Sequence, residues 1–196
     1  VRHKTLLPTY DVFDEDRYFE PAAENLPIDF KGRRLGVTIC EDLWNDEDFW
    51  PLRRYRPNPA AQLVAAGADL LVNLSASPWH VGKDRTRQAM LSSLAVKHGV
   101  PLVYCNLVGG NDELIFDGQS CAFDSLGRLI HWSRGFAEDH AEIEVDAPGQ
   151  APTPALPVEQ QLYEALVLGT GDYLRKCGFK SAVLGLSGGI DSAVVA

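Results

Sequence analysis

The sequence predicts a layered α/β fold, in which helices pack against β-sheets. Two observations predict it: apolar, β-rich runs alternate with stretches of helical periodicity, and glycines stand at the ends of several of these segments. The predicted elements, in chain order, are strand 34–40, helix 59–66, strand 69–74, helix 83–98 and strand 101–106. Gly67 and Gly99 follow the two helices directly, where glycine is a favoured C-cap.

More strands are predicted on either side of this alternation. Residues 119–124 and 129–132 flank Ser125-Leu126-Gly127-Arg128, which is typical of a β-hairpin. Residues 141–145 predict another short strand. The chain also begins in what is predicted to be a strand, and the residues from Lys4 to Pro8 lead out of it.

A proline-rich stretch predicts a boundary between two domains. Residues 146–157 hold four prolines and Gly149, so they favour neither a helix nor a central strand. We place a linker at residues 147–157, between domains at 1–146 and 158–196. In the second domain, residues 158–177 have helical periodicity, and residues 181–186 predict a strand that begins a new βα unit.

Composition narrows the functional classes. The formal net charge of −9 argues against nucleic acid or an anionic membrane surface as the main partner. No apolar run approaches the roughly 18 residues of a membrane span. The four cysteines are widely spaced and form no C-x-x-C pair, which favours reduced thiols in a cytoplasmic enzyme over a disulfide framework or a zinc site.

One cysteine lies where a nucleophile could be presented. The apolar run 34–40 ends at Cys40, and Glu41-Asp42 break its pattern. A thiol that cleaves amides needs a rigid mount, a base and a group that stabilises the oxyanion. Lys4 is the natural cation to favour the thiolate of Cys40. The alternative is that Cys40 is a buried structural cysteine.

A glycine-rich segment near the end of the chain predicts a phosphate-binding loop. Gly185-Leu186-Ser187-Gly188-Gly189-Ile190-Asp191-Ser192 follows a predicted strand and opens a helix. Its glycines would let the backbone approach the pyrophosphate of ATP, and the helix N-terminus offers free N–H groups. Asp191 would bind the Mg²⁺ that accompanies ATP. The alternative is a strand–helix turn with an Asp or Ser N-cap.

Several of these segments, as an ordered set, resemble the nitrilase (carbon–nitrogen hydrolase) superfamily. They are residues 4–19, 36–44 and 73–79, and the resemblance extends to about residue 145. Within the superfamily they look most like the glutaminase domain of the glutamine-dependent NAD synthetases. The S-G-G-x-D-S string resembles the pyrophosphate loop of the N-type ATP pyrophosphatases. The resemblance implies a partial nitrilase-like α/β sandwich, followed by the first helix and βα unit of a Rossmann-like ATP pyrophosphatase domain.

The resemblance also implies roles for individual residues. Cys40 would be the nucleophile and Lys4 the cation of a Glu-Lys-Cys triad, whose base glutamate we expect upstream of Val1. Glu15 stands where the superfamily often has a supporting glutamate; an exposed loop carboxylate is the alternative. The residues expected to contact glutamine are Tyr10, Ser77 and Lys83, although Lys83 could instead be a solvent-exposed helix residue.

The activity implied is the amidation of nicotinic acid adenine dinucleotide to NAD. Glutamine would supply ammonia through a thioester at Cys40, and ATP with Mg²⁺ would adenylate the dinucleotide. The same resemblance implies a cytoplasmic homo-oligomer, of which this chain would be an internal piece. Two other hypotheses stand beside it: a free-standing nitrilase-class amidase, and a truncated fragment without activity.

Overall fold

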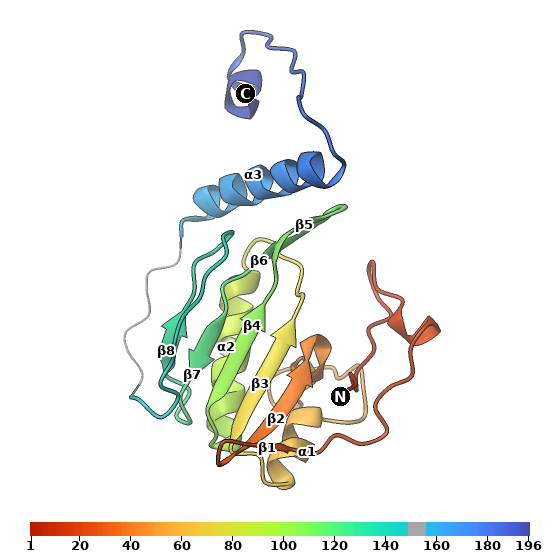
Figure 1. Cartoon of the computed structure of the whole chain (residues 1–196), viewed down its shortest axis with the longest axis vertical. Helices are drawn as coiled ribbons and strands as arrows, with labels where there is room; N and C mark the ends of the chain where they lie inside the picture. Colours follow the sequence, from red (N-terminus) through yellow and green to blue (C-terminus); the bar gives the residue numbers. More distant parts are fainter. Residues whose placement is uncertain (149–155) are drawn as a thin grey trace.

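The computed structural model describes residues 1–148 and 156–196, and a mixed six-stranded sheet lies at its centre (Figure 1). The strands follow the order β1-β2-β3-β4-β7-β8 across the sheet. Their bounds are β1 Ile28–Phe30, β2 Arg33–Ile39, β3 Leu70–Ser75, β4 Leu102–Asn106, β7 Cys121–Phe123 and β8 Leu129–Trp132. The three central strands, β2, β3 and β4, run parallel, and the others pair antiparallel.

Two helices make the crossovers between the parallel strands. Helix α1 (Pro59–Ala65) connects β2 to β3, and its N-cap Asn58 accepts a hydrogen bond from the Ala61 N–H. Helix α2 (Lys83–His98) connects β3 to β4 and ends at Gly99, which has the left-handed conformation. Both predicted helices are therefore confirmed.

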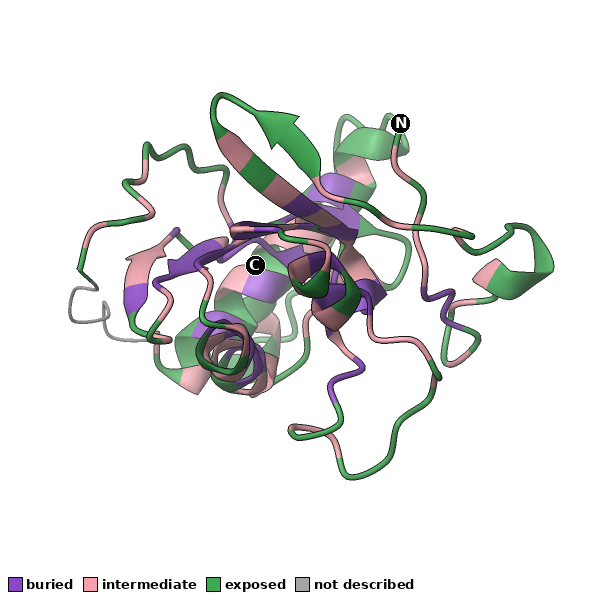
Figure 2. Ribbon diagram, turned by 90° about the horizontal axis from the view of Figure 1, so that it is seen from below, coloured by how far each residue is buried: buried purple, intermediate pink, exposed green. Residues whose placement is uncertain are grey.

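Both helices cover the same face of the sheet, and the hydrophobic core lies between the helices and that face. Its fully buried members include Leu63, Leu71, Leu91 and Leu102. Figure 2 shows the buried residues gathered in the sheet and its helices. On the opposite face, the paired residues Leu74 and Cys105 are exposed.

The helix-covered face of the sheet becomes polar toward the carboxyl ends of its parallel strands. Thr38, Asn73 and Tyr104 are neighbours in register on β2, β3 and β4, and all three are fully buried. In open α/β sheets, this end of parallel strands is where ligands bind. The sheet therefore presents a polar end on which a site can be built.

A separate two-stranded hairpin lies beyond β4. It consists of β5 (Val108–Asn111) and β6 (Leu114–Asp117), and helix α3 (Val158–Lys176) packs on it (Figure 1). The short helices η1 (Glu15–Arg17), η2 (Cys40–Leu43) and α4 (Ile190–Val195) complete the secondary structure. No helix among the described residues is long and apolar enough to span a bilayer.

Three strand predictions are wrong, and the hairpin β5–β6 was not predicted. The strand predicted at the start of the chain is absent: residues 1–4 are irregular, and the N–H groups of Thr5 and Leu6, which follow them, donate to the Asp42 carboxylate. Residues 141–145 and 181–186 are also irregular, and no described strand lies in register beside them. The predicted hairpin with β7 and β8 is confirmed, whereas residues 149–155 of the predicted linker lie outside the described part.

Candidate active site

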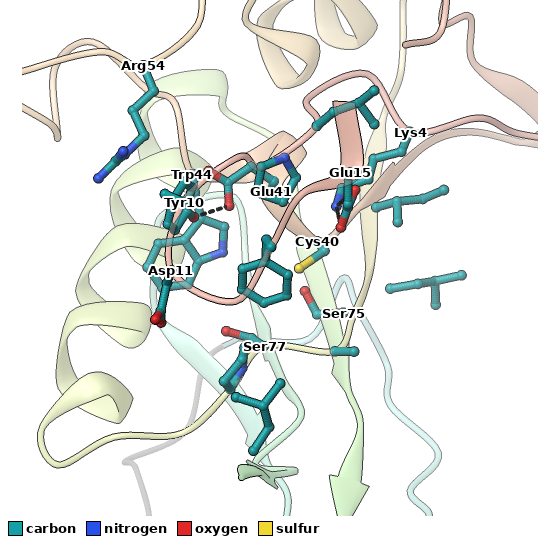
Figure 3. Close-up of a pocket in the computed structure, with 18 of the residues that line it drawn as sticks. Lys4, Tyr10, Asp11, Glu15, Cys40, Glu41, Trp44, Arg54, Ser75 and Ser77 are labelled. Carbon is teal, nitrogen blue, oxygen red and sulfur yellow. Dashed lines mark hydrogen bonds and ion pairs between the residues drawn. The ribbon is translucent and has the colours of Figure 1, made fainter. Parts of the chain in front are cut away.

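The turn that presents Cys40 begins where β2 ends, at Ile39. Cys40 has a φ of +45°, a conformation that is uncommon for a residue with a β-carbon, and it opens the 3-10 turn η2. Asp42 Oδ2 accepts a hydrogen bond from the Ile39 N–H over 3.0 Å, which closes this turn. Figure 3 shows the Cys40 sulfur directed toward the interior of a pocket, between Glu15 and Ser75.

Asp42 also draws the N-terminal segment to the turn. Its Oδ1 accepts the N–H groups of Thr5 and Leu6 at 3.0 and 2.8 Å. Burial raises the pKa of the Asp42 carboxyl, and the three N–H donors oppose that rise. A single carboxylate thereby fixes Lys4, the neighbour of Thr5, to the turn that carries Cys40.

Lys4 and Glu15 form an ion pair at the edge of the pocket. Lys4 Nζ lies 2.6 Å from Glu15 Oε2 and 2.7 Å from Oε1, and both side chains are partly buried. The Glu15 N–H donates to the Pro8 carbonyl, which anchors the 3-10 turn η1. Glu15 is thus in contact with the predicted cation and is not a solvated loop carboxylate.

A buried polar network lies beneath Cys40. Asn73 Nδ2 donates to Thr38 Oγ1 at 3.0 Å and to the Cys40 carbonyl at 3.4 Å. Asn73 Oδ1 in turn accepts the Ser75 hydroxyl at 2.9 Å. The network ties the Cys40 backbone to β3, so the sheet supports the strained turn.

All the residues predicted for the glutaminase site line this one pocket of about 1190 Å³. They are Lys4, Tyr10, Glu15, Cys40, Ser77 and Lys83. Trp44 and Trp79 also line it, so two aromatic side chains form part of its wall, and Trp44 packs against the hydrophobic core as well. Segments that are far apart in sequence are therefore brought to one cavity.

Tyr10 and Glu41 meet on the opposite side of the pocket from the Lys4–Glu15 pair (Figure 3). The Tyr10 hydroxyl donates to Glu41 Oε2 over 2.7 Å, and the Arg54 guanidinium lies 4.2 Å from the Tyr10 ring centroid. Burial, together with Glu41, raises the pKa of Tyr10, so its phenol stays protonated. This side of the pocket therefore offers both a carboxylate and a cation.

Lys83, the first residue of α2, and Ser77, in the segment after β3, both line the pocket. Lys83 Nζ donates to the Pro78 carbonyl over 2.7 Å and lies 5.3 Å from the Trp44 ring centroid. Burial, and secondarily the nearby Arg87, lowers the pKa of Lys83. Ser77 is buried, and its N–H donates to Asn106 Oδ1 over 3.0 Å. Lys83 is consequently not a solvent-exposed helix residue.

The sequence reasoning missed several residues of the pocket. Glu41 could have been found, because it adjoins Cys40 and is a carboxylate at the end of an apolar strand. Arg54, Asp11 and Ser75 carry no comparable signal, since they reach the pocket only through loop and strand geometry (Figure 3).

The predicted ATP loop, residues 185–192, lies apart from this pocket on an exposed segment. Ser192 Oγ lies 3.0 Å from Ser187 Oγ and accepts the Ser187 N–H at 3.2 Å. Gly188 has a φ of +87°, which favours glycine. Asp191 is in the first turn of α4, and no group of three potential metal ligands occurs among the described residues.

Each of the two parts of the chain matches a known protein family. The carbon–nitrogen hydrolase family model matches residues 1–149, and the NAD synthase model matches residues 162–196. The chain belongs to the carbon–nitrogen hydrolase family.

Relatives of this carbon–nitrogen hydrolase match it over nearly its whole length. It is 53% identical over 99% of its length to glutamine-dependent NAD(+) synthetase of Synechocystis sp., and 37% identical over its full length to that of Thermotoga maritima. It covers 36% and 39% of those proteins, so it spans little more than a third of their length.

Solved structures confirm the fold class. The glutamine-dependent NAD+ synthetase of Acinetobacter baumannii, solved with ADP, matches 97% of this chain with a TM-score of 0.82 and 37% identity, and 35% of that protein is covered. A carbon–nitrogen hydrolase from Helicobacter pylori has the same fold over 71% of this chain and 48% of its own, with a TM-score of 0.56 and 24% identity. The predicted nitrilase-like α/β fold is thus confirmed.

Proposed function

We propose that this chain forms the glutamine-hydrolysing site and the beginning of the ATP-binding domain of a glutamine-dependent NAD synthetase. One observation carries the proposal: the strained Cys40 turn and the Lys4–Glu15 pair line the same pocket, in a chain whose later residues match the NAD synthase family. We assign residues 1–146 to the glutaminase domain, 147–157 to the linker and 158–196 to the synthetase domain.

The proposed chemistry begins at Cys40. Its sulfur attacks the side-chain carboxamide carbon of glutamine, the C–N bond breaks, and ammonia leaves with the thiol proton, which a carboxylate base transfers. The family resemblance places that base on a glutamate upstream of Lys4. Water then hydrolyses the thioester to glutamate. Lys4, held by Glu15, provides positive charge for the tetrahedral intermediate.

The other end of the glutamine molecule carries an ammonium and a carboxylate, which must be recognised separately. Lys83 supplies a cation and Ser77 a hydroxyl for the carboxylate. Tyr10 lies on the side of the pocket opposite the Lys4–Glu15 pair, where its phenol donates a hydrogen bond to Glu41. We propose that these residues bind the amino-acid end of a substrate whose amide lies at Cys40.

The released ammonia would serve the second half of the reaction. There, ATP adenylates the carboxylate of nicotinic acid adenine dinucleotide, and ammonia displaces AMP to give NAD. The loop 185–192 would hold the ATP phosphates through its backbone N–H groups and the hydroxyls of Ser187 and Ser192. We further propose a cytoplasmic homo-oligomer.

The predicted ATP loop offers one carboxylate as a ligand for Mg²⁺. Mg²⁺ in nucleotide sites takes one or two carboxylates together with phosphate oxygens and water. Asp191 is an exposed carboxylate in the first turn of α4, beside the glycines that would approach the phosphates. We propose Asp191 as the protein ligand, and the ion would neutralise phosphate charge there.

Covalent labelling tests the assignment of Cys40. The experiments below use the longer protein, which is this chain within a polypeptide of the length of its curated relatives. An electrophilic glutamine analogue should modify Cys40, and glutamine should protect it. Peptide mapping measures the label on Cys40 against that on Cys105, which is exposed on β4 outside the pocket. Preferential labelling of Cys105, or no protection by glutamine, would refute the assignment.

Asp191→Asn tests the ATP loop in the longer protein. The substitution keeps the size of the side chain but removes the charge that Mg²⁺ prefers. We expect NAD synthesis from saturating ammonia to fall at least about tenfold, with a higher Mg²⁺ requirement, while labelling of Cys40 persists. Unchanged synthesis and Mg²⁺ dependence would leave Asp191 as a helix residue without a metal role.

A further inference from the structure

Two oppositely charged side chains are fully buried beneath the Ser77 side of the pocket. Arg87 on α2 donates from Nη1 to Asp117 Oδ1 at 3.0 Å and from Nη2 to Oδ2 at 2.6 Å, and neither side chain is exposed to solvent. A buried ion pair seldom stabilises a fold more than apolar residues of the same volume would. Core stability alone is therefore a weak reason for this pair.

The pair reaches Ser77 through one intermediate residue, Asn106. Asn106 Nδ2 donates to Asp117 Oδ1 and to the Gly118 carbonyl, both at 3.0 Å. An ionised carboxylate only accepts hydrogen bonds, so Asp117 fixes which end of the Asn106 amide faces it. The other end, Oδ1, is thereby aimed at the Ser77 N–H, 3.0 Å away.

The same helix holds the next residue of the pocket wall. Lys83, one turn before Arg87 on α2, donates to the Pro78 carbonyl. The Trp79 N–H donates to the Ile115 carbonyl of β6 over 2.6 Å. The backbone of Ser77, Pro78 and Trp79 is thus held at each residue, and the Arg87–Asp117 pair, together with the Gly118 carbonyl, orients Asn106 for the first of these contacts.

We propose that Arg87 and Asp117 are positioning residues for glutamine binding: the pair orients Asn106, and Asn106 holds Ser77 where the amino-acid end of glutamine binds. This inference rests on the proposed function of the pocket. Neither Arg87 nor Asp117 lines the pocket, so neither touches the substrate. Loss of the pair should therefore weaken glutamine binding and leave the reactivity of Cys40 intact.

The test replaces the pair by apolar residues in the longer protein. The double variant Arg87→Met with Asp117→Leu keeps similar volume and leaves no unpaired charge, so it should fold. We expect the KM for glutamine to rise about fivefold or more, the factor that follows from losing one net hydrogen bond, with a smaller change in kcat. Asn106→Ala, which retains the ion pair, should raise the KM similarly and provides a second route if the double variant fails to fold.

Two controls separate positioning from general damage to the fold. Leu94→Ala removes a buried side chain two turns further along α2, and it should lower stability without raising the KM for glutamine. Alkylation of Cys40 by iodoacetamide, which has no amino-acid end, should proceed at the wild-type rate in the double variant. NAD synthesis from ammonia should also be unchanged there.

The outcomes distinguish this inference from the function on which it rests. If the wild-type protein does not hydrolyse glutamine, the proposed function fails and the inference falls with it. If wild type hydrolyses glutamine and both the double variant and Asn106→Ala keep its KM, only the inference is overturned. It is likewise overturned if Leu94→Ala raises the KM as much as the double variant does.

Discussion

Cys40 adopts a backbone conformation that its own side chain disfavours. A non-glycine residue at a φ of +45° costs on the order of 1–3 kcal/mol, and the surroundings must hold it in place. Asp42 and Asn73 do so, through the Ile39 N–H and the Cys40 carbonyl. The sequence predicted a nucleophile at a strand end, but the turn itself was not predictable, because it depends on contacts with β3.

Lys83 offers a test at the same scale, through pH. Because burial lowers its pKa below the usual 10.5, Lys83 loses its charge at a lower pH than an exposed lysine does. As the pH rises through that value, the KM for glutamine should increase, since the carboxylate loses its cation. In Lys83→Arg the charge persists, so this increase should move to higher pH.

The ionisable groups of free glutamine change charge at the same pH in assays of the wild type and of Lys83→Arg. The comparison therefore isolates the side chain at position 83. A rise in KM for Lys83→Arg that is equal at every pH would reflect an altered fit of the side chain to glutamine. Only the shape of the pH profile tests whether Lys83 binds the carboxylate. Profiles of the same shape would show that Lys83 does not bind the carboxylate.

At the scale of elements, helical periodicity and capping glycines made the helices predictable, whereas the hairpin β5–β6 had no such pattern. The predicted bounds of α2 agree with the structure because Gly99 caps its end. The hairpin β5–β6 was missed, since Gly109 and Gly110 weaken a strand signal. Those glycines serve close packing instead: the Gly110 N–H donates to Asp172 of α3 over 2.8 Å.

The docking of α3 on this hairpin can be tested with two glycines of the same helix. A β-carbon at Gly169 would lie 3.0 Å from Ile115 Cδ1, whereas one at Gly171 would meet nothing within 4 Å. Gly169→Leu should therefore destabilise the docking of α3 by about 1–3 kcal/mol through overpacking. Gly171→Leu, the matched control, should leave α3 as stable or slightly more so, since leucine favours helices.

Hydrogen exchange of the α3 amides in the longer protein measures this local stability. Exchange should become faster in Gly169→Leu and stay as slow as wild type in Gly171→Leu. Equal protection in the two variants would show that α3 does not depend on close contact with the hairpin.

For the whole molecule, the alternation of the central strands and helices was predictable, whereas the pocket was predictable only in part. The alternation of strands and helices follows from periodicity. The strand end indicated Cys40 with Lys4, and the family resemblance supplied Tyr10, Ser77 and Lys83. Arg54 and Asp11 join the pocket through irregular segments, whose course in space has no periodic signal in the sequence. The strand predicted at 181–186 failed because a strand needs a hydrogen-bonded neighbour, and none of the described strands pairs with it.

The central claim is that Cys40 supplies ammonia to a separate synthetic site, and ammonia rescue tests it most directly. The measurement is NAD formation by the longer protein carrying Cys40→Ala, with glutamine or with free ammonia as the nitrogen source, and Cys105→Ala as the control. Glutamine-dependent synthesis should be abolished in Cys40→Ala, while synthesis from ammonia should equal that of wild type, and Cys105→Ala should retain both. Persistence of glutamine-dependent synthesis, or failure of ammonia to rescue Cys40→Ala, would contradict the account.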